Sequence, residues 1–310
     1  MRLTFLGTAS SRPTVTRNVS CIALQREGDL FLLDCGEGTQ RQMMRYGVGF
    51  GVRDIFITHL HSDHYLGIIG LVRTLGLQGR QEPLGVWGPP GGRETLEEAV
   101  RLGGDRVLFP VDIRELPPGE SVCYGDYRIQ AFPTEHTASS VGYALLERQR
   151  LGRFDVERAR ALGVPEGPDF GRLHRGEPVR LADGRIVQPE EVVGPPRPGR
   201  AVVYTGDTRP AESTVEIAAG ADLLVHEATF GEEERGRARE TRHSTARQAA
   251  EIATRARVRS LVLTHLSARY SEQPRRLRRE AAAVFPACTV AEDGDVIEVF
   301  YADASRKRDR

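Results

Sequence analysis

Lysine is almost absent from this sequence: Lys307 is the only one among 43 basic residues. A phosphate-binding loop of the GxxxxGK[ST] type requires a lysine, so a P-loop nucleotide hydrolase is excluded for everything before the tail. The chain also lacks net charge, because 43 acidic residues balance the basic ones. A basic excess is common in nucleic-acid binders, so any attraction to nucleic acid must come from local clusters of charge.

Cysteine and long apolar runs are scarce as well. The four cysteines have no CxxC spacing, which argues against a thiolate zinc site and a disulfide framework and indicates buried thiols in a reducing compartment. No apolar run approaches the ~20 residues of a membrane span. The first residues turn polar too early for a signal peptide. We therefore expect a cytoplasmic protein with no membrane partner.

The remaining composition is that of a globular protein, and 310 residues can form one large domain. Both halves of the chain contain short apolar strands followed by helices, which favours an α/β fold with an αββα sandwich. The expected strands are 3–6, 21–25, 30–34, 54–58, 86–88, 127–133, 201–205, 221–226, 260–264 and 295–301. The expected helices are 38–46, 66–77, 93–102, 245–255 and 275–285.

Residues 151–200 differ from the rest of the domain 1–310. They are rich in proline and glycine, their charge is nearly even, and they show little periodicity. We expect an inserted, flexible arm without regular structure, because a stretch of this length in a compact domain is usually functional or disordered. We interpret His174, inside the arm, as a solvated loop residue.

The strongest chemical signal is the segment His59-Leu60-His61-Ser62-Asp63-His64. It follows a buried strand, and on extended backbone residues two apart project to the same side, so His59 and His61 can bind one cation. The chain then turns toward a helix, which lets Asp63 and His64 face a second cation. Imidazole and carboxylate ligands suit zinc, and such a set keeps a position open for water.

Further ligand candidates stand where later strands end. His136, Asp207 and His265 each follow an expected strand, so they should gather at one edge of the sandwich. Each is a weak signal alone, but together they complete a set for two metal ions. The same ligands also accept manganese or iron.

At this point the sequence resembles ribonuclease Z, a family of the metallo-β-lactamase superfamily. His59 to His64 matches the superfamily motif HxHxDH. The narrower resemblance rests on residues 34–40 (DCGEGTQ), on residues 226–229 (HEAT), on residues 243–245 (HST) and on the Gly/Pro-rich arm with its Pro165-Glu166-Gly167-Pro168. It spans about residues 1–301.

The resemblance implies a metallo-β-lactamase fold with an exosite arm and two Zn²⁺ per subunit. One ion would be bound by His59, His61 and His136 and the other by Asp63, His64 and His265, with Asp207 bridging them. Asp63 would orient the attacking water and accept its proton. His243, supported by Glu227, would assist the departing 3′ oxygen.

The implied reaction removes the 3′ trailer from precursor tRNA, leaving a 3′-hydroxyl on the tRNA and a 5′-phosphate on the trailer. The resemblance also implies a homodimer in which the arm clamps the tRNA of the partner subunit. The alternative is another phosphodiesterase or an arylsulfatase-like hydrolase of the same fold, which would share the metal motifs. A non-catalytic RNA-binding scaffold would lack ligands, and none is missing.

Three features remain open. Val15 stands where the family loop Pro-x-Lys-x-Arg-Asn has its lysine, so the resemblance does not extend to the handling of a CCA end. The cluster at residues 275–279 is either a solvated helix face or a set of phosphate contacts. The charged tail, residues 305–310, is expected to be inert.

Overall fold

The computed structural model describes residues 1–102 and 107–303, so the charged tail lies outside the described part. The chain divides into two compact units. One comprises Met1–Leu146 and the chain from Arg200 onward, and the other comprises Glu147–Gly199.

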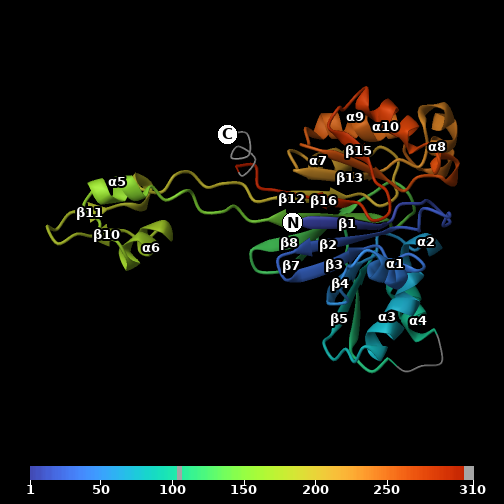
Figure 1. Cartoon of the computed structure of the whole chain (residues 1–310), viewed down its shortest axis with the longest axis horizontal. Helices are drawn as coiled ribbons and strands as arrows, with labels where there is room; N and C mark the ends of the chain where they lie inside the picture. Colours follow the sequence, from blue (N-terminus) through green and yellow to red (C-terminus); the bar gives the residue numbers. More distant parts are fainter. Residues whose placement is uncertain (103–106, 304–310) are drawn as a thin grey trace. The chain divides into compact units, whose positions relative to one another are not determined.

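The first unit contains two mixed sheets, each of seven strands in the described residues (Figure 1). The first sheet has the order β16-β1-β2-β3-β4-β5-β6. Adjacent strands of this sheet are antiparallel from β16 to β3 and parallel from β3 to β6. Its strands are β1 (Arg2–Gly7), β2 (Cys21–Arg26), β3 (Asp29–Leu33), β4 (Val52–Phe56), β5 (Leu84–Gly88), β6 (Val111–Glu115) and β16 (Val296–Glu298).

The second sheet has the order β15-β14-β13-β12-β9-β8-β7. It is parallel from β12 to β15, and β9 runs antiparallel to β12. Parallel neighbours put their carboxyl ends at one edge, so residues that follow these strands meet there. Its strands are β7 (Ser121–Cys123), β8 (Tyr127–Pro133), β9 (Val141–Glu147), β12 (Ala201–Tyr204), β13 (Leu223–Glu227), β14 (Leu261–Thr264) and β15 (Cys288–Val290).

Helices cover the outer face of each sheet. Helix α3 buries Ile68, Leu71, Val72 and Leu75, which form one stripe at helical spacing. The helices beside the first sheet are α1 (Thr39–Arg45), α2 (Ser62–Tyr65), α3 (Gly67–Leu77) and α4 (Arg93–Arg101). Those of the second half are α7 (Glu212–Ile217), α8 (Arg235–Thr241), α9 (Ala246–Ala256) and α10 (Pro274–Ala282), with the 3₁₀ turns η2 (Glu232–Glu234) and η3 (Ala268–Tyr270).

Three apolar clusters hold these layers together. One lies between the sheets and joins side chains of both, such as Phe56 and Tyr143, whose rings pack edge to face. The other two lie between each sheet and its helices. The predicted αββα sandwich is confirmed, because a sheet with both faces apolar needs a layer on each side.

The second unit has secondary structure of its own, so the expectation of an irregular arm is wrong. It contains α5 (Val156–Ala161), α6 (Pro168–His174), η1 (Pro189–Glu191) and a hairpin of β10 (Val179–Arg180) and β11 (Ile186–Val187). A small apolar cluster that includes Ala159, Leu173 and Val192 stabilises it. His174 is not a solvated loop residue: it ends α6 half-buried, with Nε2 2.9 Å from the carbonyl oxygen of Gly152. The flexibility of this arm stays a prediction.

The described residues include no helix long and apolar enough to cross a membrane.

Candidate active site

The HxHxDH segment has the local geometry that its sequence predicts. Strand β4 ends at Phe56, and His61 is still extended (φ −73°, ψ 143°) as the residue before helix α2. His59 and His61 therefore share one side of extended backbone, whereas Asp63 and His64 lie on the first turn of α2. All but His61 of these four side chains are buried.

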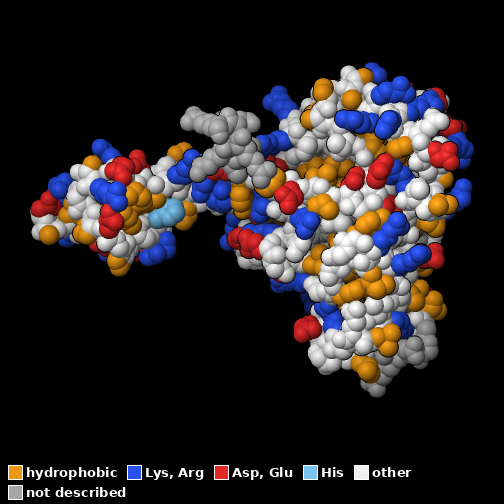
Figure 2. All heavy atoms as spheres, in the orientation of Figure 1, with side chains coloured by type: hydrophobic (Ala, Val, Ile, Leu, Met, Phe, Trp, Pro, Cys, Tyr) orange, Lys and Arg blue, Asp and Glu red, His pale blue; other side chains and the backbone are white. Residues whose placement is uncertain are grey.

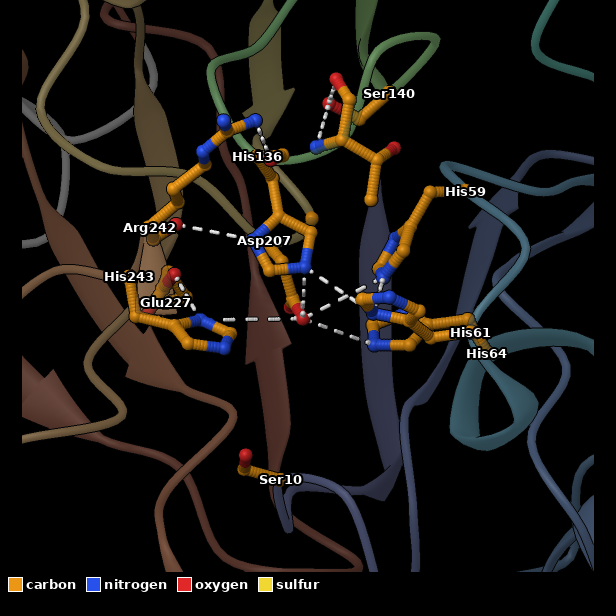
Figure 3. A network of polar contacts seen from close by, with 12 residues as sticks. Ser10, His59, His61, His64, His136, Ser140, Asp207, Glu227, Arg242 and His243 are labelled. Carbon is orange, nitrogen blue, oxygen red and sulfur yellow. Dashed lines mark hydrogen bonds and ion pairs between the residues drawn. The ribbon is translucent and has the colours of Figure 1, made fainter. Parts of the chain in front are cut away.

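The first cluster combines two His of this segment with two residues from the second sheet. The possible ligand atoms of His59, His61, His136 and Asp207 lie within 4.8 Å of one another (Figure 3). His59 Nε2 is 3.0 Å and His136 Nε2 is 3.2 Å from His61 Nδ1. Two nitrogens on one tetrahedral zinc, each at about 2.0–2.1 Å, are about 3.3 Å apart, so the donor set and its spacing fit a zinc ion.

The second cluster lies beside the first. The possible ligand atoms of Asp63, His64 and His265 also lie within 4.8 Å of one another. His64 Nε2 and His265 Nε2 are 3.3 Å apart, and Asp63 Oδ2 is 3.4 Å from His265 Nε2.

Asp207 stands between the two clusters. Its Oδ2 is 3.6 Å from His59 Nε2 and 3.4 Å from His64 Nε2. Its Oδ1 lies 3.2 Å from His265 Nδ1 and is buried without a hydrogen bond among the described residues. A buried carboxylate so placed needs compensating positive charge, which a cation on either side would supply. The surrounding imidazoles hold the pKa of Asp207 well below its usual range despite burial, which raises it.

A second layer of hydrogen bonds fixes the imidazole rings of the candidate ligands. Buried Asp34 accepts from Thr58 N at 2.8 Å and from Tyr204 OH at 2.7 Å, and its Oδ2 lies 2.8 Å from His64 Nδ1. Holding the far nitrogen of an imidazole fixes its tautomer and directs the other nitrogen at the metal. The remaining pairs are His59 Nδ1 with Thr58 Oγ1 (3.0 Å), His136 Nδ1 with Arg242 O (3.0 Å) and His265 Nδ1 with Thr229 Oγ1 (3.0 Å).

Half-buried His243 and buried Glu227 form a pair next to the first cluster. Glu227 ends β13, accepts from the backbone N–H of Thr208 at 2.9 Å and lies 2.7 Å from His243 Nδ1. Burial lowers the pKa of His243, but the Glu227 and Asp207 carboxylates outweigh it and raise this pKa to about 9. His243 Nδ1 is also 4.0 Å from Asp207 Oδ2, and Asp207, His243 and His265 form a third group of possible metal ligands. Because Glu227 engages that nitrogen, the other one is left for a substrate.

Backbone strain is concentrated here. Six described non-glycine residues have positive φ, and four of them touch the site: Ser11, Asp34, Arg242 and His265. Such strain persists only where the surroundings impose it. At Ser11 the reason is visible, since its amide donates to Asp63 Oδ2 at 2.7 Å.

The N-terminal loop that carries Ser11 is held in place by hydrogen bonds of Arg17. Arg17 is buried and donates to Thr8 Oγ1 at 2.7 Å and to Ala291 O at 2.6 Å. Val15 is fully exposed at the tip of the loop. Sequence reasoning did not identify the contacts of Ser11, Asp34 and Arg242, although Asp34 lies within a recognised motif and the other two lie near one.

Comparison with known proteins gives matches over nearly the whole chain. Residues 1–152 match the family model described as anti-Pycsar protein Apyc1, and residues 178–266 match the beta-lactamase superfamily domain. A protein named ribonuclease Z from Gemmatimonas aurantiaca is 58% identical over 95% of both chains. Another from Haloferax volcanii is 56% identical over 98% of this chain and 96% of its own.

Solved structures give the same picture. Human tRNase Z, short form, aligns with a TM-score of 0.70 at 28% identity, covering 97% of this chain and 100% of its own. The metallo-beta-lactamase fold protein YhfI from Bacillus subtilis aligns with a TM-score of 0.68, covering 96% and 99%. At 21% identity the latter likeness shows the fold alone.

Proposed function

Because the chain belongs to the ribonuclease Z family, as its full-length relatives at 50% identity and above show, we propose that it removes the 3′ trailer from precursor tRNA with two zinc ions. The chain is a hydrolase and an endoribonuclease of tRNA 3′ processing. The observation that carries the zinc proposal is the pair of adjacent His/carboxylate clusters, with Asp207 in the first and its Oδ2 3.4 Å from His64 Nε2 of the second.

The two ions would be held by the predicted ligand sets. His59, His61 and His136 would hold one, Asp63, His64 and His265 would hold the other, and Asp207 would bridge them. When bound, two such cations lower the pKa of water and neutralise charge that builds up on a phosphate during displacement.

The protein's own groups would handle the protons. Asp63, with one oxygen fixed by the amide of Ser11, would orient the attacking water and accept its proton. His243 would hydrogen-bond the departing 3′ oxygen and protonate it, while Glu227 keeps its ring in place. The products would be a 3′-hydroxyl and a 5′-phosphate.

The arm would contribute binding rather than chemistry. It forms a compact unit of its own, and every proposed ligand lies in the other unit. We propose that it clamps precursor tRNA bound to a partner subunit in a homodimer. A cytoplasmic location is supported by the free thiols of Cys21, Cys35, Cys123 and Cys288.

The test compares substrates on one zinc-loaded preparation. We expect a precursor tRNA with a 3′ trailer to be turned over with a much higher kcat/KM than a 3′,5′-cyclic nucleotide or an aryl sulfate. The opposite ranking would favour the alternative hydrolases, which share the ligand motif.

A further inference from the structure

Arg242 lies beside the site in a conformation that its side chain does not favour. It follows helix α8 with φ 57° and ψ 43°, a left-handed backbone that glycine adopts without steric cost. No step of the function proposed above uses its side chain. A non-glycine residue held there is a reason to look for a function of the side chain.

Two hydrogen bonds fix Arg242 between the first cluster and His243. Its Nη1 donates to the carbonyl oxygen of His136 at 3.0 Å, and its own carbonyl oxygen lies 3.0 Å from His136 Nδ1. Figure 3 shows the guanidinium above His136, with His243 below it on the same segment. These two hydrogen bonds, one from the side chain and one at the backbone of Arg242, fix the position of its guanidinium relative to the clusters.

The charge of Arg242 is not compensated. Its side chain is exposed, and among the described residues no carboxylate pairs with it. Arg209, which follows Asp207 closely, is by contrast paired with Glu135 at 2.6 Å. On the face of the first unit that Figure 2 draws, acidic and basic side chains are interspersed. A cation without a carboxylate partner, such as Arg242, is the kind of local charge that can attract a phosphate.

We propose that Arg242 binds the phosphate on the 5′ side of the last nucleotide retained in the tRNA. This rests on the proposed function, because His243 at the departing 3′ oxygen defines which side of the scissile phosphate is the tRNA side. Arg242 precedes His243 directly, and its guanidinium lies on the same side of the clusters (Figure 3), so it would be placed to reach the backbone of that same nucleotide. One of its five N–H donors is used on His136, and the others can form charge-assisted bonds to phosphate oxygens.

The test places one neutral methylphosphonate at this phosphate in a precursor tRNA. With the zinc-loaded full chain and the unmodified substrate, we expect Arg242→Ala to raise KM by about 10- to 100-fold, with a smaller effect on kcat. The slope of log kcat/KM against log salt should become shallower by about 0.7. On the methylphosphonate substrate the penalty of the variant should largely disappear, because the charge it would bind is gone.

Two further variants keep the test decisive. Arg242→Gly removes the side chain and suits the left-handed backbone, so it should reproduce Arg242→Ala without a folding defect. Arg128→Ala removes an exposed cation at the far end of β8, the strand that leads to His136, and should behave as the unaltered chain.

The assignment is overturned if the penalty persists in full on the methylphosphonate substrate, because Arg242 would then act only through His136. In that case zinc content and hydrolysis of a nitrophenyl phosphodiester should fall along with tRNA cleavage. It is also overturned if a methylphosphonate at a neighbouring position removes the penalty instead. If the unaltered chain does not cut the unmodified precursor, the proposed function itself fails.

Discussion

Replacing Asp34 by Asn should weaken zinc binding at the second cluster, although Asp34 is not one of the proposed zinc ligands. Asp34 Oδ1 accepts from Thr58 N, and Oδ2 faces both His64 Nδ1 and the Tyr204 hydroxyl. An asparagine amide has only one oxygen, so it cannot accept hydrogen bonds both from Thr58 and from the His64 and Tyr204 side. If the oxygen stays with Thr58, the NH₂ group faces His64 and favours the tautomer with the proton on Nε2, the nitrogen that points at His265.

The expected magnitude follows from this loss of orientation. Removing a partner that orients a metal ligand typically costs 10–100-fold in metal affinity, which corresponds to about 1.4–2.7 kcal/mol. We expect one zinc to be lost to a competing chelator in Asp34→Asn while the zinc of the first cluster is retained. Chelator competition with a colorimetric zinc indicator measures both steps.

Asp54→Asn is the matched control. Asp54 lies on β4, the strand that precedes the site, and accepts from Trp87 Nε1 at 3.0 Å and Tyr124 OH at 2.8 Å. Both substitutions should lower the free energy of unfolding by about 1–3 kcal/mol, but only Asp34→Asn should change zinc affinity. Equal zinc affinity in the two variants would refute the reasoning.

Four further predictions concern the metals, the arm and the pair of His243 and Glu227. Metal analysis should find about two zinc ions per chain, and Asp207→Ala should lose both, whereas retention of one ion would show that Asp207 does not bridge. Replacing residues 152–198 by a short linker should spare hydrolysis of a nitrophenyl phosphodiester and cripple cleavage of precursor tRNA, and equal losses would make the arm structural. His243→Ala should keep its zinc and lose about 10²–10⁴-fold in tRNA cleavage, with a smaller loss on the activated aryl diester; a collapse of zinc content would make His243 a ligand. In the metal-free chain, the raised pKa of His243 increases the free energy of unfolding; this contribution is complete at pH values below the pKa of His243 in the unfolded chain and is lost as pH rises through about 9. Denaturant unfolding at a series of pH values should show this loss, and Glu227→Gln should make the loss smaller.

The convergence of the proposed ligand residues could be predicted because the information is local. His59 to His64 combines a buried strand with the start of a helix, and the other candidates each follow an apolar strand. Strand ends at one edge of a sandwich converge whatever the connections are. The structure accordingly brings together every side chain that the sequence singled out as a ligand.

What the sequence did not reveal depends on contacts distant along the chain. Asp34 meets Tyr204 across 170 positions, and Arg242 meets His136 across 106, so no local pattern signals either contact. Strand β9 (Val141–Glu147) was missed because its first five residues are all buried, which removes the alternation that marks a strand. Helix α8 (Arg235–Thr241) was missed because it buries only Ala238 and shows no apolar stripe.

The arm was read as irregular for a related reason. Its helices are short, and each contributes one buried side chain, Ala159 from α5 and Leu173 from α6. Such elements are stabilised by packing on each other rather than by their own periodicity.

The measurement that tests the central claim most directly is the mapping of both ends produced from a precursor tRNA by the zinc-loaded chain. The account predicts a single internal cut at the 3′ end of the acceptor stem, with a 3′-hydroxyl on the tRNA and a 5′-phosphate on an intact trailer. It also predicts that activity disappears when zinc is removed and returns when zinc is restored. A ladder of shortened trailers, a 3′-phosphate on the tRNA, or full activity in the chelated chain would contradict it.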